Sequence, residues 1–330
     1  MKICSKCVLP ETFPGIRFNG EGVCNYCLNS GSMERLNSEK AKYRQKFEDL
    51  IARCSKGSGY DCLVCFSGGK DSTYTLDLLK NRYGLRILAV TMDNGFISPV
   101  AMDNIRRMVE GIGVDHLFFK PRFDLLKQIF ARAATEVFYS GKTLQRASTI
   151  CTSCISIVKF TALRIAIEQE IPFVGYGWSP GQAPVQSSVM RTNPSLIRAA
   201  QKSIQGPLVE RFGHDVDVYF LEEHHFKKTD FFPYNVHPLA FLEYNETRIY
   251  KRLGELGWVR PEDTDPNSTN CLLNTYANYV HQQQFGYNPY AFEIAKMVRE
   301  GIMSREEGLC RFKDPPQSEQ LDILRQRLGI

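Results

Sequence analysis

Short apolar runs alternate with amphipathic segments in the first 180 residues of the chain. Two of these amphipathic segments place apolar side chains on one helical face: residues 73–83, and a stretch with Ile105, Met108, Val109 and Ile112. The apolar runs are short and nearly continuous, as in strands buried on both faces, at residues 62–66, 86–91, 116–119 and 172–175. Strands that alternate with helices indicate a parallel sheet covered on both faces. The pattern therefore predicts a doubly wound α/β domain.

The pattern changes on either side of this domain. Residues 33–54 form a charged amphipathic pattern, with Tyr43, Phe47, Leu50 and Ile51 on one face. Beyond residue 181 the chain is mainly helical, with candidate helices at 195–204, 243–256 and 290–300, and with a capping box at Ser304 and Glu307. We divide the chain into an N-terminal unit at 1–32, a linking helix at 33–58, an α/β domain at 59–180 and a mainly helical region at 181–330.

The composition is that of a globular protein, with 43% apolar and 23% charged residues in a chain of 330. No apolar stretch approaches the ~20 residues that a membrane span needs, and the N-terminus has no signal-peptide core. We therefore expect a cytoplasmic protein with no membrane partner. The formal net charge of +5 is compatible with a polyanionic partner but does not require one.

Eleven cysteines are many for a reducing compartment, where metal binding or catalysis explains them better than disulfides do. Two Cys-x2-Cys hooks, Cys4 with Cys7 and Cys24 with Cys27, flank a segment rich in proline and glycine. Four thiolates at this spacing are typical of a zinc ribbon, in which they surround a structural Zn²⁺ ion. A redox pair or a chance pairing is the alternative. Because about thirty residues bury little core, metal binding would supply the folding free energy.

The first predicted strand is joined to the next helix by six residues: Ser67, Gly68, Gly69, Lys70, Asp71 and Ser72. Two glycines let backbone N–H groups approach an anion, and the helix start adds unpaired N–H donors and the positive end of its dipole. The spacing differs from the Walker pattern, which has four residues between its first glycine and Gly-Lys-Ser/Thr. The 67–72 loop therefore predicts a phosphate site other than an ordinary P-loop. A glycine turn without a ligand is the alternative.

The 67–72 loop resembles the PP-loop of the ATP pyrophosphatases, a superfamily related to the adenine nucleotide alpha hydrolases. Its members cleave ATP between the α and β phosphates and adenylate a substrate oxygen. The resemblance implies a HUP-type α/β fold, with ATP and Mg²⁺ as cofactors. It also implies that Lys70 and Asp71 are catalytic as well as nucleotide-binding residues.

Two further strand ends carry candidate nucleotide contacts. Asp93 follows the strand at 86–91, Gly175 ends the strand at 172–175, and Gly177 lies in the segment into which that strand runs. Ligands of parallel sheets bind beyond the carboxyl ends of the strands. In PP-loop enzymes this strand end borders the adenosine, so Asp93 is a candidate for contact with ribose, adenine or Mg²⁺; a turn without a functional role is the alternative. The glycines would let a nucleotide or substrate approach the backbone, although a flexible loop would contain the same residues.

A third Cys-x2-Cys pair, Cys151 with Cys154, lies just before a helical stretch, and Cys271 has no cysteine nearby in the sequence. Three thiolates can hold a [4Fe–4S] cluster and leave one iron open to substrate or hydrosulfide. Two other interpretations stay open, namely persulfide and disulfide chemistry, or packing. Four further cysteines are assigned to packing: Cys54, Cys62, Cys65 and Cys310. Four histidines without ligand spacing are assigned to packing or solvent roles: His214, His224, His225 and His237.

Two families resemble the chain more broadly. The pair Cys151 and Cys154 with the lone Cys271 is similar to the cysteine set of the cluster-dependent tRNA thiolases, in which the cluster carries the incoming sulfur. The opening Cys-Val-Leu-Pro-Glu-Thr-Phe-Pro-Gly-Ile, Gly-Val-Cys-Asn-Tyr-Cys, Met-Asp-Asn-Gly, and the late Glu-Ile-Ala-Lys and Ser-Arg-Glu-Glu resemble the N-acetyl sugar amidotransferases. That family is thought to use ammonia from a partner glutaminase. The Cys-Thr-Ser-Cys segment departs from its pattern and favours sulfur.

The resemblances imply that residues 59–180 bind ATP and that residues 181–330 bind the acceptor. In the predicted reaction an acceptor carbonyl or amide oxygen is adenylated, pyrophosphate is released, and sulfur replaces the oxygen. The alternatives are an amidotransferase and a non-catalytic nucleotide-binding adaptor. The acceptor stays open between a small molecule, a sugar and tRNA. A sulfide donor, a glutaminase partner and a homodimer also stay open.

Overall fold

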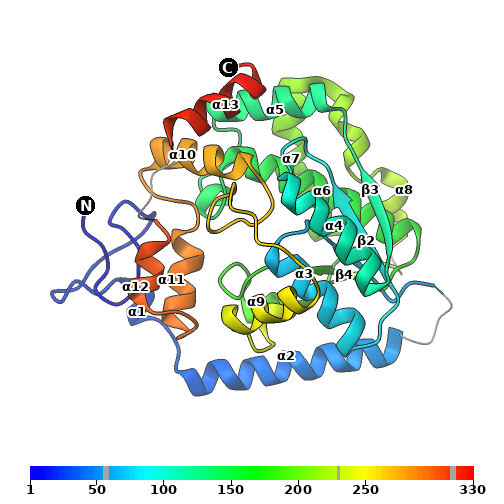
Figure 1. Ribbon diagram of the computed structural model, residues 1–330, viewed down its shortest axis with the longest axis horizontal. Coiled ribbons are helices and arrows are strands. Elements are labelled where there is room, and N and C mark those ends of the chain that lie inside the picture. The colour runs from blue at the N-terminus through cyan, green and yellow to red at the C-terminus, as the bar shows by residue number, and fades with distance from the viewer. Residues whose placement is uncertain (55–58, 229–230, 313–316) are drawn as a thin grey trace.

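A six-stranded sheet forms the centre of the computed structural model, which describes residues 1–54, 59–228, 231–312 and 317–330 (Figure 1). The strand order is β3-β2-β1-β4-β6-β5, and every pairing is parallel except that of β5 with β6. The strands are β1 (Cys62–Cys65), β2 (Ile87–Met92), β3 (Asp115–Phe119), β4 (Phe173–Tyr176), β5 (Val189–Arg191) and β6 (Tyr234–Val236). This mostly parallel sheet confirms the predicted α/β class. The chain order reverses direction between β1 and β4, which is where such sheets bind ligands.

Helices cover both faces of the sheet. The α-helices of the described residues are α1 (Asn25–Leu28), α2 (Met33–Cys54), α3 (Lys70–Asp77), α4 (Pro99–Ile112), α5 (Phe123–Thr135), α6 (Thr149–Glu168), α7 (Pro194–Phe212), α8 (Glu223–Lys227), α9 (Glu246–Glu255), α10 (Leu273–Phe285), α11 (Ala291–Arg299), α12 (Arg305–Cys310) and α13 (Ser318–Leu328). A π-helical turn, Leu78–Arg82, continues α3. Short 3-10 turns lie at Thr143–Gln145, Val185–Ser187, Gly213–Tyr219 and Pro238–Ala240.

Alternate residues of each central strand pack on opposite sides. Val64 of β1 lies in a core cluster with Phe47 of α2 and Ile105 of α4. Its neighbour Leu63 lies in a separate cluster with Ala162 of α6. Burial on both faces explains why these strands are continuously apolar in the sequence.

The predicted strands match β1 to β4 to within one residue at each end. Strands β5 and β6 were not predicted, and they extend the sheet into the region beyond residue 180. The predicted linking helix corresponds to α2, and its residues 55–58 lie outside the described residues. The mainly helical C-terminal region is confirmed, as is the capping box of Ser304 and Glu307, which starts α12.

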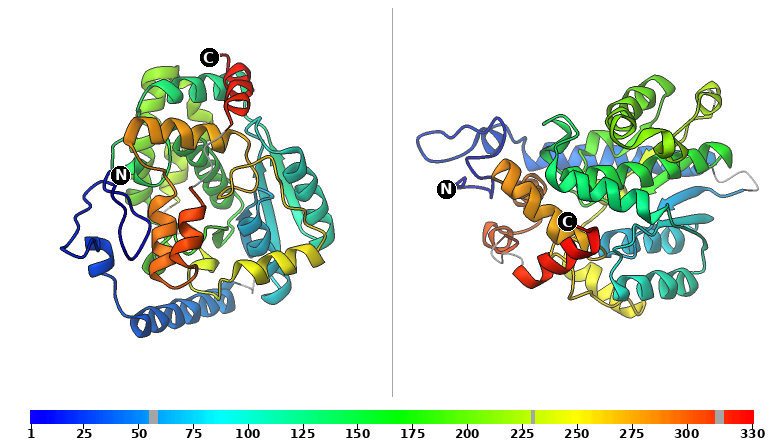
Figure 2. Two further views of the ribbon diagram at one scale, coloured as in Figure 1. Left: turned by 60° about the vertical axis from the view of Figure 1, so that its left-hand side comes forward. Right: turned by 90° about the horizontal axis from the view of Figure 1, so that it is seen from above.

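The N-terminal segment packs against α11 and α12 (Figure 2). Phe13 stacks on Phe292 of α11 with ring centroids 5.5 Å apart, and its edge meets Tyr287 at 5.1 Å. Two isolated bridges, Ile3 with Pro10 and Phe18 with Cys24, organise the segment itself. Its small core is therefore completed by helices from the other end of the chain.

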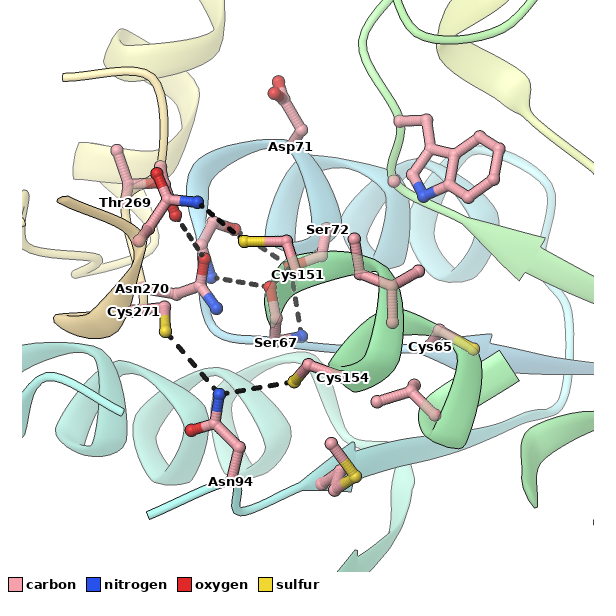
Figure 3. Close-up of a pocket in the computed structure, with 18 of the residues that line it drawn as sticks. Cys65, Ser67, Asp71, Ser72, Asn94, Cys151, Cys154, Thr269, Asn270 and Cys271 are labelled. Carbon is pink, nitrogen blue, oxygen red and sulfur yellow. Dashed lines mark hydrogen bonds between the residues drawn. The ribbon is translucent and has the colours of Figure 1, made fainter. Parts of the chain in front are cut away.

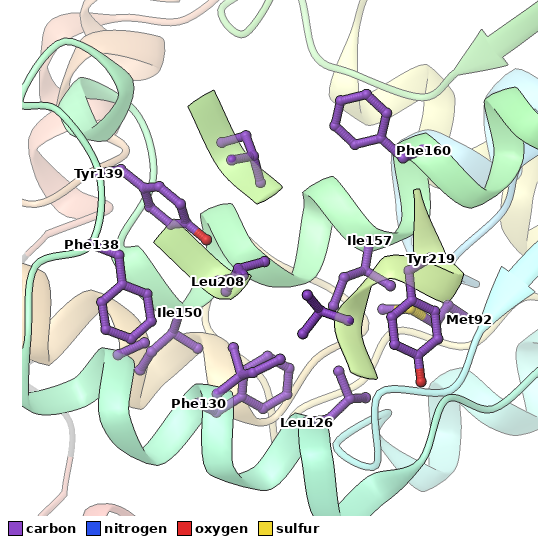
Figure 4. Packing of buried hydrophobic residues seen from close by; sticks show 14 of the residues in the cluster. Met92, Leu126, Phe130, Phe138, Tyr139, Ile150, Ile157, Phe160, Leu208 and Tyr219 are labelled. Atoms are coloured by element: carbon purple, nitrogen blue, oxygen red, sulfur yellow. The ribbon is translucent and has the colours of Figure 1, made fainter. Parts of the chain in front are cut away.

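Helix α6 lies against the largest core cluster, together with α5, α7, α10 and α13 (Figure 4). Its 20 residues are long and apolar enough, with a mean hydropathy of 1.7, to meet the length and composition of a membrane span. The expectation that no stretch of this kind exists was therefore wrong. The helix is apolar on several sides because it is a core helix: 56% of its apolar stretch is buried inside the protein.

His281 of α10 makes stability depend on pH. It is fully buried, and neither ring nitrogen has a hydrogen-bond partner among the described residues. Burial lowers the pKa of His281 to about 4, whereas an unfolded histidine titrates near about 6.5. Between these values the unfolded chain binds a proton that the folded chain does not, so the free energy of unfolding falls as the pH falls from about 6.5 to about 4.

We expect His281→Leu to flatten this dependence by up to ~1.4 kcal/mol per pH unit. The measurement is the free energy of urea unfolding at pH 7 and pH 5. Val280→Ala changes a buried side chain of the same helix that binds no proton, and it should keep the wild-type slope. The same slope in His281→Leu as in the wild type would contradict the prediction.

Candidate functional site

The backbone between β1 and α3 turns at Gly68, which has a φ of +74°. A Cβ at this position would lie 2.6 Å from Cγ1 of Ile105 and 2.7 Å from the carbonyl oxygen of Ala101, so a side chain would clash with α4. Trp258 Nε1 donates a hydrogen bond of 2.8 Å to the carbonyl oxygen of Gly68. The 67–72 loop is therefore held between α4 and the chain that follows α9.

Hydroxyl oxygens accept hydrogen bonds from the N–H groups of this loop. Ser72 Oγ accepts from the backbone N–H of Ser67 at 3.2 Å, and Thr269 Oγ1 accepts from that of Lys70 at 2.7 Å. The expectation of an unpaired helix start was therefore wrong for Lys70. Thr269 lies 199 residues away in the chain, so no local signal could have predicted this contact. The N–H groups of Ser67 and Lys70 thus point toward oxygen atoms, which here are hydroxyl oxygens of the protein. An anion bound at this loop would offer oxygen acceptors to the same N–H groups.

The ammonium group of Lys70 lies among carboxylates beside the loop. Its Nζ is 2.9 Å from Glu246 Oε1 and 3.0 Å from Asp71 Oδ1, and it donates to the hydroxyl of Tyr244 at 2.5 Å. Burial favours the neutral amine, but the charges of Asp71 and Glu246 outweigh it and raise the pKa of Lys70. Lys70 is therefore a permanent cation at neutral pH.

A cavity of about 290 Å³ opens beyond the carboxyl ends of β1, β2 and β4 (Figure 3). This position corresponds to the reversal of strand order, where ligands of such sheets bind. The sequence-predicted site residues that line it are Ser67, Gly69, Lys70, Asp71, Ser72, Cys151, Cys154, Gly177 and Cys271. The structure therefore brings the loop and the second cysteine set to one cavity.

Three segments position these cysteines. Cys151 and Cys154 lie in the first turns of α6, whose N-cap Ser148 accepts a hydrogen bond from the N–H of Cys151 at 3.0 Å. Cys271 precedes α10 and forms an isolated bridge with Ile97, which follows β2. The sequence analysis predicted that Cys151 and Cys154 lie just before a helix, but both residues lie inside α6.

Two asparagine amides face the three sulfur atoms. Asn94 Nδ2 donates to Cys154 Sγ at 3.5 Å and to Cys271 Sγ at 3.6 Å (Figure 3). Asn274 Nδ2 donates to Cys151 Sγ at 3.6 Å. Burial raises the pKa of Cys151 to about 11 and also raises that of Cys271, while these amides act in the opposite direction. Asn94 therefore stabilises the thiolate of Cys271, and Ser148 together with Asn274 stabilises that of Cys151.

The three sulfurs are spaced differently from those of the four N-terminal cysteines, Cys4, Cys7, Cys24 and Cys27. Within the described residues, they are not among the sets of ligand atoms that all lie within 4.8 Å of one another. A single metal ion needs such close ligands, whereas each thiolate of a [4Fe–4S] cluster binds a different iron atom. Three thiols at one cavity are the donor set that a [4Fe–4S] cluster with one open iron position would need.

Three sequence-predicted nucleotide contacts do not line the cavity: Gly68, Asp93 and Gly175. Asp93 accepts from the N–H of Gly95 at 2.8 Å and pairs with Lys120 at 2.9 Å, so its carboxylate supports the turn after β2. The neighbouring Asn94 faces the cavity in its place. Gly175 serves close packing, because a Cβ there would lie 3.1 Å from Leu79 Cδ1.

Lys159 is a site residue that the sequence did not reveal. It lines the cavity from α6, and its Nζ lies 4.6 Å from the ring centroid of Trp178 and 5.8 Å from that of Tyr176. Among the described residues it forms no ion pair with a carboxylate, and burial lowers its pKa. The lining contains two lysines and one carboxylate, Lys70, Lys159 and Asp71, and Lys159 is the lysine that has no carboxylate partner among the described residues.

The four N-terminal thiols form a closed group. The sulfurs of Cys4, Cys7, Cys24 and Cys27 all lie within 4.8 Å of one another. Although burial opposes the thiolate, backbone N–H donors from Cys7, Cys24 and Lys6 lower the pKa of Cys4 to about 6. Since the thiolate is the form that binds metal, this group can hold a metal ion.

A second close group consists of Glu168, His224 and His225. His225 Nδ1 accepts from the backbone N–H of Glu222 at 3.0 Å, which leaves Nε2 to donate to Glu168 Oε1 at 3.0 Å. These bonds account for the close approach of His225 to Glu168. Of the cysteines assigned to packing, Cys62 is buried in the core, Cys65 borders the cavity and Cys310 is exposed, so the assignment was wrong for Cys310.

Comparisons of sequence find few similar proteins. The chain is 23% identical over 329 residues to an uncharacterized protein of Methanocaldococcus jannaschii, covering 99% of each. A shorter part, 87 residues, is 32% identical to the glutamine-hydrolyzing GMP synthase of Pyrobaculum aerophilum, and covers 25% of this chain but only 17% of that enzyme. No family model matches the chain.

Many solved structures are similar to this chain, and three enzymes among them have low TM-scores. U34-tRNA thiolase NcsA from Methanococcus maripaludis, with its [4Fe–4S] cluster, is 16% identical with a TM-score of 0.38, covering 100% of this chain and 98% of that one. NMN synthetase from Francisella tularensis is 11% identical at 0.36, covering 87% and 99%. NH3-dependent NAD synthetase from Campylobacter jejuni is 9% identical at 0.37, covering 91% and 94%.

The chain just after β4 can approach the 67–72 loop closely because residue 177 is a glycine without a side chain. A Cβ on Gly177 would lie 2.4 Å from Cα of Ser72 and 2.5 Å from its backbone nitrogen. We expect Gly177→Ala to lower the free energy of unfolding by about 1–3 kcal/mol through overpacking. The control is Gly111→Ala on the exposed side of α4, where nothing lies within 4 Å, and it should be neutral or up to about 1 kcal/mol more stable. Equal denaturation midpoints for the two variants would refute this account.

Proposed function

We propose that this protein uses ATP to adenylate a carbonyl or amide oxygen of an acceptor, with release of pyrophosphate, and then replaces that oxygen with sulfur. One observation carries the proposal: the 67–72 loop lines the same cavity as Cys151, Cys154 and Cys271. A glycine-rich loop alone suits many nucleotide-binding proteins. Thiols facing the same cavity add a place for sulfur beside the carbon that ATP would activate.

The 67–72 loop would bind the phosphates of ATP. Phosphate oxygens are stronger acceptors than the hydroxyls of Ser72 and Thr269, which accept from the N–H groups of Ser67 and Lys70 here. The cationic Lys70 adds charge neutralisation. Asp71 also lines the cavity and offers a carboxylate to the Mg²⁺ ion that accompanies ATP.

Adenylation needs little covalent chemistry from the protein. The acceptor oxygen attacks the α-phosphorus, an O–P bond forms, and the bond to the bridging oxygen breaks as pyrophosphate leaves. Positioning and charge stabilisation lower this barrier. We assign the stabilisation to Lys70 and, in its protonated form, to Lys159, because both residues line the cavity. The acceptor oxygen then leaves as part of AMP when sulfur attacks the activated carbon.

Cys151, Cys154 and Cys271 would hold a [4Fe–4S] cluster. When bound there, a cluster with three protein thiolates supplies an open iron position to which hydrosulfide can bind. Asn94 and Asn274 would orient the cysteine sulfurs and stabilise their negative charge through the hydrogen bonds already present. For the four N-terminal thiols, Cys4, Cys7, Cys24 and Cys27, we propose a structural Zn²⁺ ion, because four thiolates leave it no open position.

Nitrogen transfer is the second candidate. It is favoured by the short segment similar to a glutamine-hydrolyzing GMP synthase. In that case ammonia from a partner glutaminase would replace the adenylated oxygen, as in the N-acetyl sugar amidotransferases that the sequence resembles. Dependence on glutamine or ammonia without iron would identify this reaction, and nucleotide binding without pyrophosphate release would identify an adaptor.

The first test follows the cleavage of ATP. Purified protein with Mg²⁺ is incubated anaerobically with tRNA, with an acetamido sugar nucleotide or with a small-molecule extract, each with sulfide. We expect AMP and pyrophosphate with one acceptor class, and at least about a hundredfold loss for Lys70→Ala, because a buried charge contact to phosphate is removed. ADP and orthophosphate as products would refute the proposal. Lys127→Ala is the control, because this lysine does not line the cavity.

The second test is metal analysis of anaerobically purified protein. We expect about four iron and four sulfide with about one zinc per chain. Cys151→Ala, Cys154→Ala and Cys271→Ala should each lose iron and keep zinc, whereas Cys4→Ser should lose zinc and keep iron. Cys310→Ala, at an exposed position, should keep both. An intact sample without iron would contradict sulfur transfer through a cluster.

A further inference from the structure

Helices α11 and α12 lie between the N-terminal segment and α3, the helix that begins at Lys70 (Figures 1 and 2). On the outer side, Arg305 of α12 donates from Nε to the carbonyl oxygens of Cys4 and Cys7, both at 3.2 Å, and from Nη2 to that of Cys4 at 3.0 Å. Gly308 adds a tight contact, because a Cβ there would lie 3.0 Å from Val8 Cγ1. The backbone of the first hook is thus fixed to α12.

The other end of α12 reaches the phosphate loop. Arg311, the residue that ends this helix, donates from Nη2 to Glu246 Oε2, and from Nη1 to the carbonyl oxygen of Pro266 at 3.1 Å. The second oxygen of the same carboxylate, Glu246 Oε1, lies 2.9 Å from Lys70 Nζ. Arg311, Glu246 and Lys70 are mostly buried, so water screens these pairs weakly. One short helix therefore connects the metal hook to the lysine of the 67–72 loop.

We propose that Arg305 and Arg311 are positioning residues through which the metal of the ribbon sets the orientation of Lys70, so that metal and nucleotide bind cooperatively. The inference rests on the proposed function only in taking Lys70 as a nucleotide-binding residue. Without metal, the carbonyls of Cys4 and Cys7 lose the fixed geometry of the hook, and Arg305 loses its fixed acceptors. The position of α12, and with it the Arg311 to Glu246 pair, is then less restricted.

The test is a double-mutant cycle read out by nucleotide binding, without turnover. The dissociation constant of α,β-methylene-ATP is measured by calorimetry for the wild type, Cys4→Ser, Arg311→Ala and the double variant. We expect Cys4→Ser to weaken binding about fivefold or more in the wild-type background, and to have little further effect once Arg311 is removed. Arg311→Ala should keep its zinc, and Arg311→Lys should restore part of the coupling. Glu306→Ala, exposed on the same helix, should behave as the wild type.

Coupling between two sites is reciprocal, so the nucleotide must also raise the zinc affinity of the wild type by the same factor. Competition with a chelator measures this second readout, and Arg311→Ala should abolish the effect. An equal loss of nucleotide affinity from Cys4→Ser in both backgrounds would overturn the inference. Zinc-independent binding by folded wild-type protein would do the same and leave the proposed function standing. If the zinc-loaded wild type binds no nucleotide, both fail.

Discussion

The contact of Thr269 with the start of α3 joins the two halves of the chain at the site. The hydroxyl of Thr269 accepts from the N–H of Lys70 at 2.7 Å, and the next carbonyl, that of Asn270, accepts from the N–H of Ser98 at 2.9 Å. Leu272 then donates to the carbonyl of Phe96, also at 2.9 Å. These bonds fix Cys271 between the ends of β1 and β2. The cysteine set depends on them, because its third member comes from a different part of the chain than the other two.

The local part of the site could be predicted from the sequence, whereas its long-range part could not. Strands β1, β2 and β4 are buried on both faces, which leaves continuous apolar runs, whereas β3 lies at the sheet edge and is largely exposed despite its apolar run. The 67–72 loop is a contiguous glycine turn. Strands β5 and β6 have three residues each, too few for a pattern. Thr269 and Lys159 belong to no recognisable sequence motif, and only the fold brings them to the cavity.

The errors have physical causes that can be named. The sequence shows that polar residues follow β2, but the conformation of the turn decides which of them faces the cavity. Here Gly95 has a φ of +81°, Asp93 bonds to its N–H, and Asn94 faces the sulfurs. Helix α6 is apolar on several sides because it is a core helix, so its start was hard to locate and Cys151 and Cys154 were placed outside it.

The docking of the N-terminal hooks on α11 and α12 has a consequence for biosynthesis. The ribosome releases Cys4 to Cys27 roughly 260 residues before it releases the helices that complete their core. At about 5–20 residues per second, this interval lasts tens of seconds. During it the nascent segment has little besides its own thiols to order it. An ion bound by the four thiols would order the segment while the chain is still being translated, whereas an undocked segment without an ion would be a good substrate for proteases.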